Sequence, residues 1–162
     1  MDVLLKGGEK MYSQLVHKSL VFYDQTFADQ EAFFKKANTD LLGTEFVTGT
    51  FYESVVKRES KYPTGLALPT MSIAIPHTDP ENINKAFIAV YHLTQPVVFT
   101  QMATIDVKVE SQLILVLGIK EPKEQVGLLS TIIDLISAED FVDQYRKIQD
   151  QEDMYQLFKK NL

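Results

Sequence analysis

The chain alternates between segments whose apolar positions suit a strand and segments whose apolar positions recur at helical spacing. Residues 16–23 are apolar enough for a strand, which Asp24 closes. From Asp29 the apolar positions follow the 3.6-residue period of a helix, and Gly43 marks its stop, because glycine is common at helix ends. The pattern therefore predicts a strand-to-helix unit over residues 16–43.

A second helix is predicted in the segment before Pro63. It starts at Gly49 or Thr50 and runs to about Lys57. Pro63 ends the segment, because a proline disfavours helical backbone at the residue before it.

The middle of the chain predicts most of the sheet. Residues 71–75 form a strand that stops at the following proline, and residues 86–93 form another before a turn at Gln95-Pro96. Residues 97–100 add a short edge piece. Residues 112–119 are continuously apolar, which is typical of a central strand covered on both faces.

The last 40 residues supply helices that can cover the sheet. Residues 125–136 have apolar positions at helical spacing; Ser137 is placed to cap a helix through Tyr145, and Asp150 to cap one through Phe158. We therefore expect an α/β fold in which a mixed β-sheet is flanked by helices on both faces, a three-layer α/β/α sandwich. Residues 1–14 are expected to be a flexible N-terminal extension, and residues 15–162 a single domain.

Composition excludes several classes of function. The chain has 22 acidic and 16 basic residues, a net charge of −6, which is the wrong sign for binding nucleic-acid phosphates or anionic membranes. It has no cysteine, so disulfides, thiolate nucleophiles and cysteine-ligated metals are excluded. The longest apolar run is far shorter than the roughly 20 residues of a membrane helix. We expect a cytoplasmic protein with no nucleic-acid partner and no membrane insertion.

Most catalytic motifs are missing. The sequence contains no phosphate-binding P-loop, no GxGxxG, no GxSxG and no HExxH. Its three histidines are scattered, so we predict no metal site and no cofactor.

One histidine stands out by its neighbours. Pro76 fixes its own φ and favours extended backbone at Ile75, and Pro80 follows shortly after. His77 is thus presented at the end of a strand on backbone with little freedom, which suits a reactive imidazole. The alternative at this point is an ordinary polar loop residue, and Arg58, upstream, could be a solvated charge at a helix end.

Three short motifs occur in order, at residues 58–59 (RE), 63–65 (PTG) and 73–77 (IAIPH), followed by the strand and helix of residues 113–136. In this combination the sequence resembles the enzyme IIA domains of the bacterial sugar phosphotransferase system, in the fructose/mannitol superfamily and closest to the galactitol-specific branch. The resemblance covers most of residues 16–162.

The resemblance implies a phosphocarrier without a cofactor. His77 would accept a phosphoryl group from the phosphohistidine of HPr and pass it to a cysteine of the cognate enzyme IIB. Arg58 is the residue expected to bind the phosphoryl oxygens, because a guanidinium makes forked contacts that lysine cannot. Thr64 and Gly65 would form a tight turn near the site, and Thr78 would donate its hydroxyl to the phosphoryl group or hold the imidazole.

Position 125 departs from the mannitol and fructose pattern. Those domains carry a second histidine in a context like HxxLLS, whereas this chain has Gln125, as in the galactitol branch. Glutamine can hydrogen-bond a phosphoryl oxygen or the ring but cannot be protonated, which makes a role for a second protonated histidine doubtful.

Two alternatives for the function of the chain stay open: a stand-alone regulatory module that signals through phosphorylation of His77, and an interaction domain with an unreactive histidine. The sequence leaves the oligomeric state undetermined.

Overall fold

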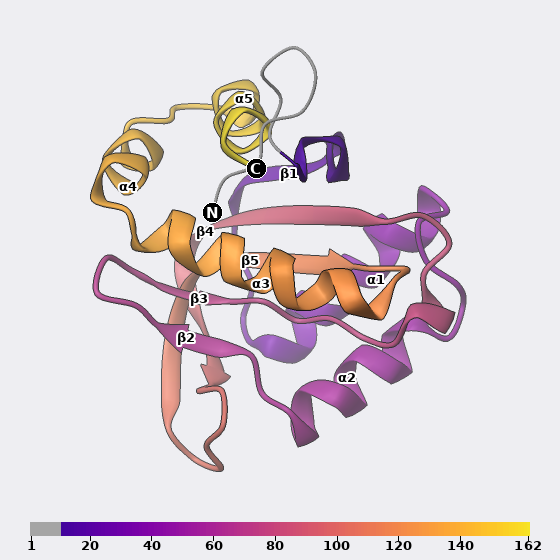
Figure 1. The fold of residues 1–162 in the computed structure, drawn as a ribbon. Helices are drawn as coiled ribbons and strands as arrows, with labels where there is room; N and C mark the ends of the chain where they lie inside the picture. Colours follow the sequence, from indigo (N-terminus) through magenta and orange to yellow (C-terminus); the bar gives the residue numbers. More distant parts are fainter. Residues whose placement is uncertain (1–10) are drawn as a thin grey trace.

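The computed structural model describes residues 11–162, which form a five-stranded sheet between two layers of helices (Figure 1). The elements in chain order are η2 (a 3₁₀ helix, Ser13–Leu15), β1 (Val16–Gln25), α1 (Gln30–Gly43), α2 (Phe51–Lys61), β2 (Gly65–Ala67), β3 (Ser72–Ala74), η3 (a 3₁₀ helix, Pro80–Asn82), β4 (Phe87–Thr100), β5 (Lys108–Gly118), α3 (Pro122–Ser137), α4 (Glu139–Arg146) and α5 (Gln151–Asn161).

The sheet is mixed, with strand order β1-β4-β5-β3-β2. β1 runs parallel to β4 and β3 runs parallel to β5, whereas the β4–β5 and β2–β3 pairs are antiparallel. The continuously apolar segment predicted as a central strand is β5, in the middle of the sheet. The prediction of a mixed sheet is confirmed.

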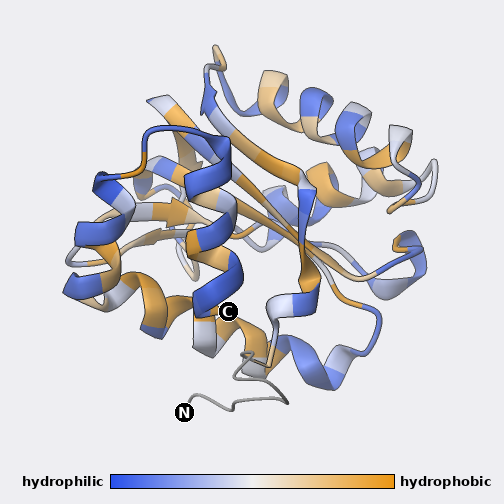
Figure 2. Cartoon of the chain, turned by 90° about the horizontal axis from the view of Figure 1, so that it is seen from above, coloured by the Kyte–Doolittle hydropathy of each residue, from blue (hydrophilic) through white to orange (hydrophobic). Residues whose placement is uncertain are grey.

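Both faces of the sheet are covered because side chains alternate along each strand. Leu113, Leu115 and Leu117 of β5 pack in one apolar cluster with α3, α4 and α5. Ile114 and Val116 pack in the other with α1 and α2. Figure 2 shows the largely hydrophobic strands between helices that mix hydrophobic and hydrophilic positions. The predicted three-layer sandwich is confirmed.

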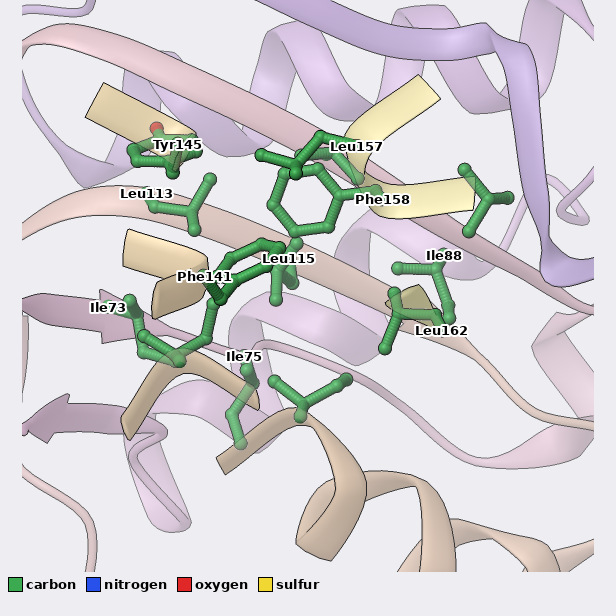
Figure 3. Close-up of a cluster of buried hydrophobic side chains, with 14 of the residues drawn as sticks. Ile73, Ile75, Ile88, Leu113, Leu115, Phe141, Tyr145, Leu157, Phe158 and Leu162 are labelled. Atoms are coloured by element: carbon green, nitrogen blue, oxygen red, sulfur yellow. The ribbon is translucent and has the colours of Figure 1, made fainter. Parts of the chain in front are cut away.

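The helices of one face are joined to the sheet by aromatic packing (Figure 3). The rings of Phe141 in α4 and Phe158 in α5 meet edge to face, with centroids 5.4 Å apart. Both belong to the cluster that contains Leu115, and burial of each such side chain contributes about 1.5–3 kcal/mol.

Two helix starts are as predicted and one is not. Asp29 and Asp150 precede α1 and α5, and each accepts a hydrogen bond, from the backbone N–H of Ala32 and Asp153, respectively, at 2.8 Å. The prediction that Ser137 caps α4 is wrong. Ser137 is the last residue of α3. The residue before α4 is Ala138, which is extended and has no polar side chain to cap the helix.

Two predicted strand boundaries are also corrected. The expected turn at Gln95-Pro96 is wrong, because β4 runs through these residues as one strand. The pairing of β4 with β5 shifts register between His92 and Val97, and an irregularity of this kind accommodates a proline that cannot donate to the ladder. β5 also starts at Lys108, four residues earlier than predicted, because it pairs with the end of β4.

Helix α2 continues one turn beyond the expected end at Lys57. Its buried positions are Phe51, Val55 and Glu59, which follow one another at a spacing of four. The third of these is polar, so the apolar pattern ends too early. Arg58 and Glu59 are therefore helical.

The expected extension over residues 1–14 is only partly within the described residues, since residues 1–10 lie outside them. Tyr12 donates its backbone N–H to the carbonyl of Leu162 at 2.7 Å, and Lys159 bonds the carbonyl of buried Ser13. These two residues therefore pack on the domain. Within residues 11–162, no helix has the length and apolar character needed to cross a membrane.

Candidate functional site

His77 lies just beyond β3, in an isolated bridge with Leu117 near the end of β5. The bridge is held by the N–H of Leu117, which bonds the carbonyl of Pro76 at 3.0 Å. Figure 1 shows the start of α3 and the segment after β3 at the same end of the molecule. The prolines therefore deliver His77 to this end of the sheet, as the sequence predicted.

The hydrogen bonding of the ring defines which nitrogen is reactive. Nδ1 of His77 lies 2.8 Å from the carbonyl oxygen of Ile75. A carbonyl only accepts hydrogen bonds, so Nδ1 carries the proton. In the neutral ring the lone pair is then on Nε2, and this is the nucleophilic nitrogen.

The environment favours that neutral ring. His77 is only 6% exposed. Burial lowers the pKa of His77, the hydrogen bond to Ile75 opposes this, the positive charge of Arg58 adds to the lowering, and Asp79 opposes it. The imidazole is therefore unprotonated at neutral pH, as nucleophilic attack requires.

Arg58 supplies the positive charge. It lies in the last turn of α2, with its guanidinium 3.6 Å from the Asp79 carboxylate and 5.4 Å from the centre of the Tyr62 ring. Its Nε is buried and has no hydrogen-bond partner among residues 11–162. The guanidinium thus holds one loose ion pair and retains donors for another anion. Asp79 precedes η3, where its backbone carbonyl accepts the N–H of Asn82 at 3.1 Å, while its side chain makes no cap and pairs with Arg58.

Thr78 is buried in a polar network centred on Asn82. The side-chain amide of Asn82 donates to Oγ1 of Thr78 at 3.3 Å, and its carbonyl oxygen accepts from the hydroxyls of Thr50 at 2.6 Å and Ser54 at 3.3 Å. Because Thr78 accepts this bond, its own hydroxyl proton stays available for a ligand. Sequence reasoning missed Asn82, since nothing in its local pattern marks it as buried.

A hollow of about 290 Å³ lies beside these residues. It is lined by Ser54, Lys57, Arg58, Lys61, Tyr62, Thr78, Asp79 and Glu81. The three basic side chains all come from α2. With the Thr78 hydroxyl, they make this hollow suitable for a small anion such as a phosphoryl group.

The expected tight turn at Thr64-Gly65 is wrong. Gly65 is instead the first residue of β2. A Cβ at this position would lie 2.7 Å from the carbonyl oxygen of Thr100, so glycine allows β2 to approach the end of β4 closely. Thr64 is buried and donates twice to Glu59, from its N–H at 2.7 Å and its hydroxyl at 2.8 Å. Its side chain therefore faces Glu59.

Glu59 itself was not assigned a role from the sequence. It is 5% exposed. Burial raises the pKa of Glu59 to about 7, against the opposing effects of the two bonds from Thr64 and of the Arg58 charge. Its burial could have been predicted from the sequence, because Glu59 follows Phe51 and Val55 at the same spacing of four along α2.

Gln125 lies in the first turn of α3 and is half-buried. Among residues 11–162, no side-chain hydrogen bond joins it to His77, Arg58 or Thr78. The structure thus brings His77, Arg58 and Thr78 to one end of the sheet, and a contact of Gln125 with the phosphoryl group stays a prediction. In the same part of the chain, no three side chains of the metal-ligating types His, Cys, Asp and Glu gather in one place.

Comparison with known proteins gives a family match over almost the whole chain. The model of the family described as "Phosphoenolpyruvate-dependent sugar phosphotransferase system, EIIA 2" matches residues 14–161. The chain is also 27% identical, over 118 residues, to the galactitol-specific EIIA component of the phosphotransferase system of Escherichia coli K12. That alignment covers 73% of this chain and 78% of the relative.

Solved structures share the fold. The structure of the complex of enzyme IIA-mannitol with phosphorylated enzyme IIB-mannitol from Escherichia coli matches with a TM-score of 0.67 and 16% identity, over 86% of this chain and 93% of that one. The nitrogen regulatory protein IIA-Ntr of Neisseria meningitidis matches with a TM-score of 0.67 and 18% identity, over 91% and 98%. At these identities the likeness concerns the fold alone.

Proposed function

This chain belongs to the EIIA 2 family of the phosphoenolpyruvate-dependent sugar phosphotransferase system, and from that premise we propose that it carries a phosphoryl group on Nε2 of His77. The observation that supports this most is the hydrogen bond from Nδ1 to the Ile75 carbonyl, which leaves the Nε2 lone pair free. The lowered pKa of His77, caused mainly by burial, keeps that lone pair unprotonated at neutral pH.

The proposed cycle has two balanced transfers. In the first, Nε2 of His77 attacks the phosphorus of phosphohistidine in HPr; the new N–P bond forms as the donor N–P bond breaks, and the electron pair returns to the donor imidazole. In the second, a cysteine thiolate of enzyme IIB attacks the same phosphorus, and His77 recovers its lone pair. A phosphoramidate is labile enough for both steps, and the protein mainly has to position the group and neutralise its charge.

Arg58 and Thr78 are the groups proposed to bind the phosphoryl oxygens. The pairing of Arg58 with Asp79 at 3.6 Å is longer than a good charge-assisted hydrogen bond, so a phosphoryl dianion competes well for the guanidinium. The hydroxyl of Thr78 adds a neutral donor. Charge-assisted bonds of this kind contribute about 1.5–3 kcal/mol each.

Partners and sugar are proposed from relatives. Enzyme IIB is supported by the solved complex of the mannitol enzymes, and galactitol by the relative in Escherichia coli. In this role the chain meets two proteins rather than the sugar, so galactitol, or a similar polyol, is proposed for the system to which the chain contributes. The cytoplasmic location expected from the sequence stays a prediction.

Reconstituted transfer tests the proposal. The chain is incubated with enzyme I, HPr and radiolabelled phosphoenolpyruvate, and enzyme IIB of the galactitol system is then added. We expect this chain to carry one acid-labile label, which is then transferred to IIB. When the IIB cysteine is replaced by serine, the transfer should be lost and the label should stay on this chain. Labelling without transfer to any IIB would favour the regulatory alternative, and absence of labelling would refute the phosphocarrier role.

A further inference from the structure

Glu59 is a buried acid that does not line the hollow beside Arg58 and Thr78. It lies on the buried stripe of α2, and its carboxylate faces the start of β2. The side chain is 5% exposed, and the proposed transfer gives it no part. A buried carboxylic acid costs stability unless it is hydrogen-bonded, so its two bonds from Thr64 need an explanation.

An unbroken series of hydrogen bonds leads from Glu59 to the reactive ring. Both oxygens of Glu59 accept from Thr64, at 2.7 Å from its N–H and 2.8 Å from its hydroxyl. The carbonyl of Thr64 accepts the N–H of Ile75 at 3.3 Å. The carbonyl of Ile75 in turn accepts Nδ1–H of His77 at 2.8 Å.

We propose that Glu59 is a positioning residue for His77, which acts by fixing Thr64 so that the Ile75 carbonyl keeps the imidazole proton on Nδ1. The effect on phosphoryl transfer rests on the proposed function; the effect on the ring tautomer does not. The other side of this segment is held by Leu117, whose N–H bonds the Pro76 carbonyl. Loss of Glu59 therefore removes the side-chain anchor of Thr64, the residue that bonds the other side of the segment that carries the histidine.

The bond pattern tolerates either protonation state of Glu59. When the acid is ionised, Thr64 donates both bonds. When it is protonated, its O–H can donate to the Thr64 hydroxyl oxygen while the other oxygen still accepts the N–H. Glutamine reproduces this second arrangement, with its amide NH₂ in place of the acid O–H, so Glu59→Gln preserves the link without a titratable group.

The test measures ring tautomer and transfer in the same variants. Two-dimensional ¹H–¹⁵N NMR of the unphosphorylated protein distinguishes a His77 ring protonated on Nδ1 from one protonated on Nε2. Transfer from phosphorylated HPr gives the rate. The variants are Glu59→Ala, Glu59→Gln and Thr64→Val, and Glu53→Ala, at an exposed position of the same helix, is the matched control.

Wild type, Glu59→Gln and Glu53→Ala should all show the Nδ1–H tautomer and transfer rates within about threefold of one another. Glu59→Ala should show a mixture of tautomers and transfer roughly tenfold more slowly, as expected for loss of about one hydrogen bond's contribution. Thr64→Val keeps the N–H bond but loses the hydroxyl bond, and should fall between them. If Glu59→Ala does not fold, Thr64→Val and Glu59→Gln provide the test.

A folded Glu59→Ala or Thr64→Val protein with the wild-type tautomer and rate would overturn the proposal, because a purely structural acid would affect stability alone. So would a Glu59→Gln protein that behaves like Glu59→Ala. Should the wild type not be labelled at all while the tautomer responds as expected, the positioning role stands and the phosphocarrier role fails.

Discussion

Two histidines flank the central strand and differ in what their rings are prepared to do. His92 in β4 pairs with Leu113 of β5, and His77 bridges Leu117 from the other side, four residues or about 13 Å along the strand. Burial lowers the pKa of both histidines. Burial alone therefore does not distinguish a reactive ring from a structural one.

The difference lies in the partner of Nδ1. Nδ1 of His77 donates to a carbonyl, whereas Nδ1 of His92 accepts the backbone N–H of Asp24 at 3.2 Å. A neutral His92 therefore carries its proton on Nε2 and has no free lone pair. Its ring is also stacked on Tyr23, with centroids 4.6 Å apart, and meets Tyr145 at 5.7 Å.

The charges around the two rings differ as well. At His77 the charge of Arg58 has a larger effect than that of Asp79, while the carboxylate of Asp24 lies 3.4 Å from Nδ1 of His92. A phosphoryl dianion would be attracted at the first ring and repelled at the second. The comparison teaches that tautomer and neighbouring charge, set by the main chain and one arginine, favour His77 over His92 as the proposed nucleophile.

The largest difference between the two histidines is expected when each ring is removed in turn by substitution. His77→Ala should abolish labelling by phosphorylated HPr, since no other ring has both a free Nε2 lone pair and a cation beside it. His92→Phe keeps the packing between the two tyrosines and should label at close to the wild-type rate. The measurement is acid-labile incorporation per folded molecule, and wild-type labelling of His77→Ala would contradict the assignment.

The neighbouring cation is tested by two arginine substitutions. Arg58→Lys should slow transfer by roughly 10- to 100-fold although the charge is kept, because the forked contacts to the phosphoryl oxygens are lost. Arg146→Lys, near His92, is the control: this arginine bonds the Thr70 carbonyl and should not affect transfer. Rapid-quench rates check both, and equal rates for Arg58→Lys and wild type would make Arg58 a surface charge.

The regions around His77 and His92 should also differ in how their carboxylates make the stability of the fold depend on pH. The pKa of Glu59 is raised to about 7 from an ordinary 4.5, so the folded state binds this proton more tightly than the unfolded state does. Its contribution is thus fully present at low pH and is lost as the pH rises through about 7. Glu59→Gln should therefore gain stability relative to wild type between about pH 5 and 8, by up to about 3 kcal/mol.

Urea denaturation across this pH range measures the difference. Asp24→Asn, at a carboxylate that is 57% exposed beside His92, is the control and should follow the wild-type profile much more closely. A constant stability difference between Glu59→Gln and wild type at every pH would show that the acid is not buried as described.

The smallest effect is expected at Gln125. If its amide bonds the phosphoryl group or the ring, Gln125→Ala should slow transfer by roughly 5- to 10-fold, the value of about one hydrogen bond. Gln125→His should add a titration between about pH 5 and 8. Val126→Ala, at the exposed next position, serves as control. Wild-type rates for Gln125→Ala at every pH would place position 125 outside the site.

Local patterns predicted the parts of the fold that depend on one segment. The continuous apolar run identified the central strand, and Asp29 and Asp150 identified two helix starts, because each signal acts within a few residues. The prolines around His77 likewise define a strand end without help from the rest of the chain. The same reasoning placed Pro96 in a turn, since a register shift that tolerates proline depends on the partner strand.

The parts of the site that were missed depend on packing between segments. Glu59 bonds Thr64 across the end of α2, and Asn82 joins hydroxyls that come from different elements. Asn82 has no local signal, and the helical spacing that places Glu59 at a buried position of α2 does not show that its carboxylate is hydrogen-bonded. The hydrogen bonds that Glu59 and Asn82 make in the folded chain are what identify them as part of the site.

The most direct test of the account is the site of the phosphoryl group in the wild-type protein. The chain, labelled with ¹⁵N in its histidine rings, is phosphorylated by enzyme I, HPr and phosphoenolpyruvate and observed by ³¹P and ¹H–¹⁵N NMR under alkaline conditions. The account predicts one phosphohistidine, with phosphorus bonded to Nε2 of His77 and the proton still on Nδ1. A phosphoryl group on Nδ1 of His77, or on His17 or His92, would contradict it.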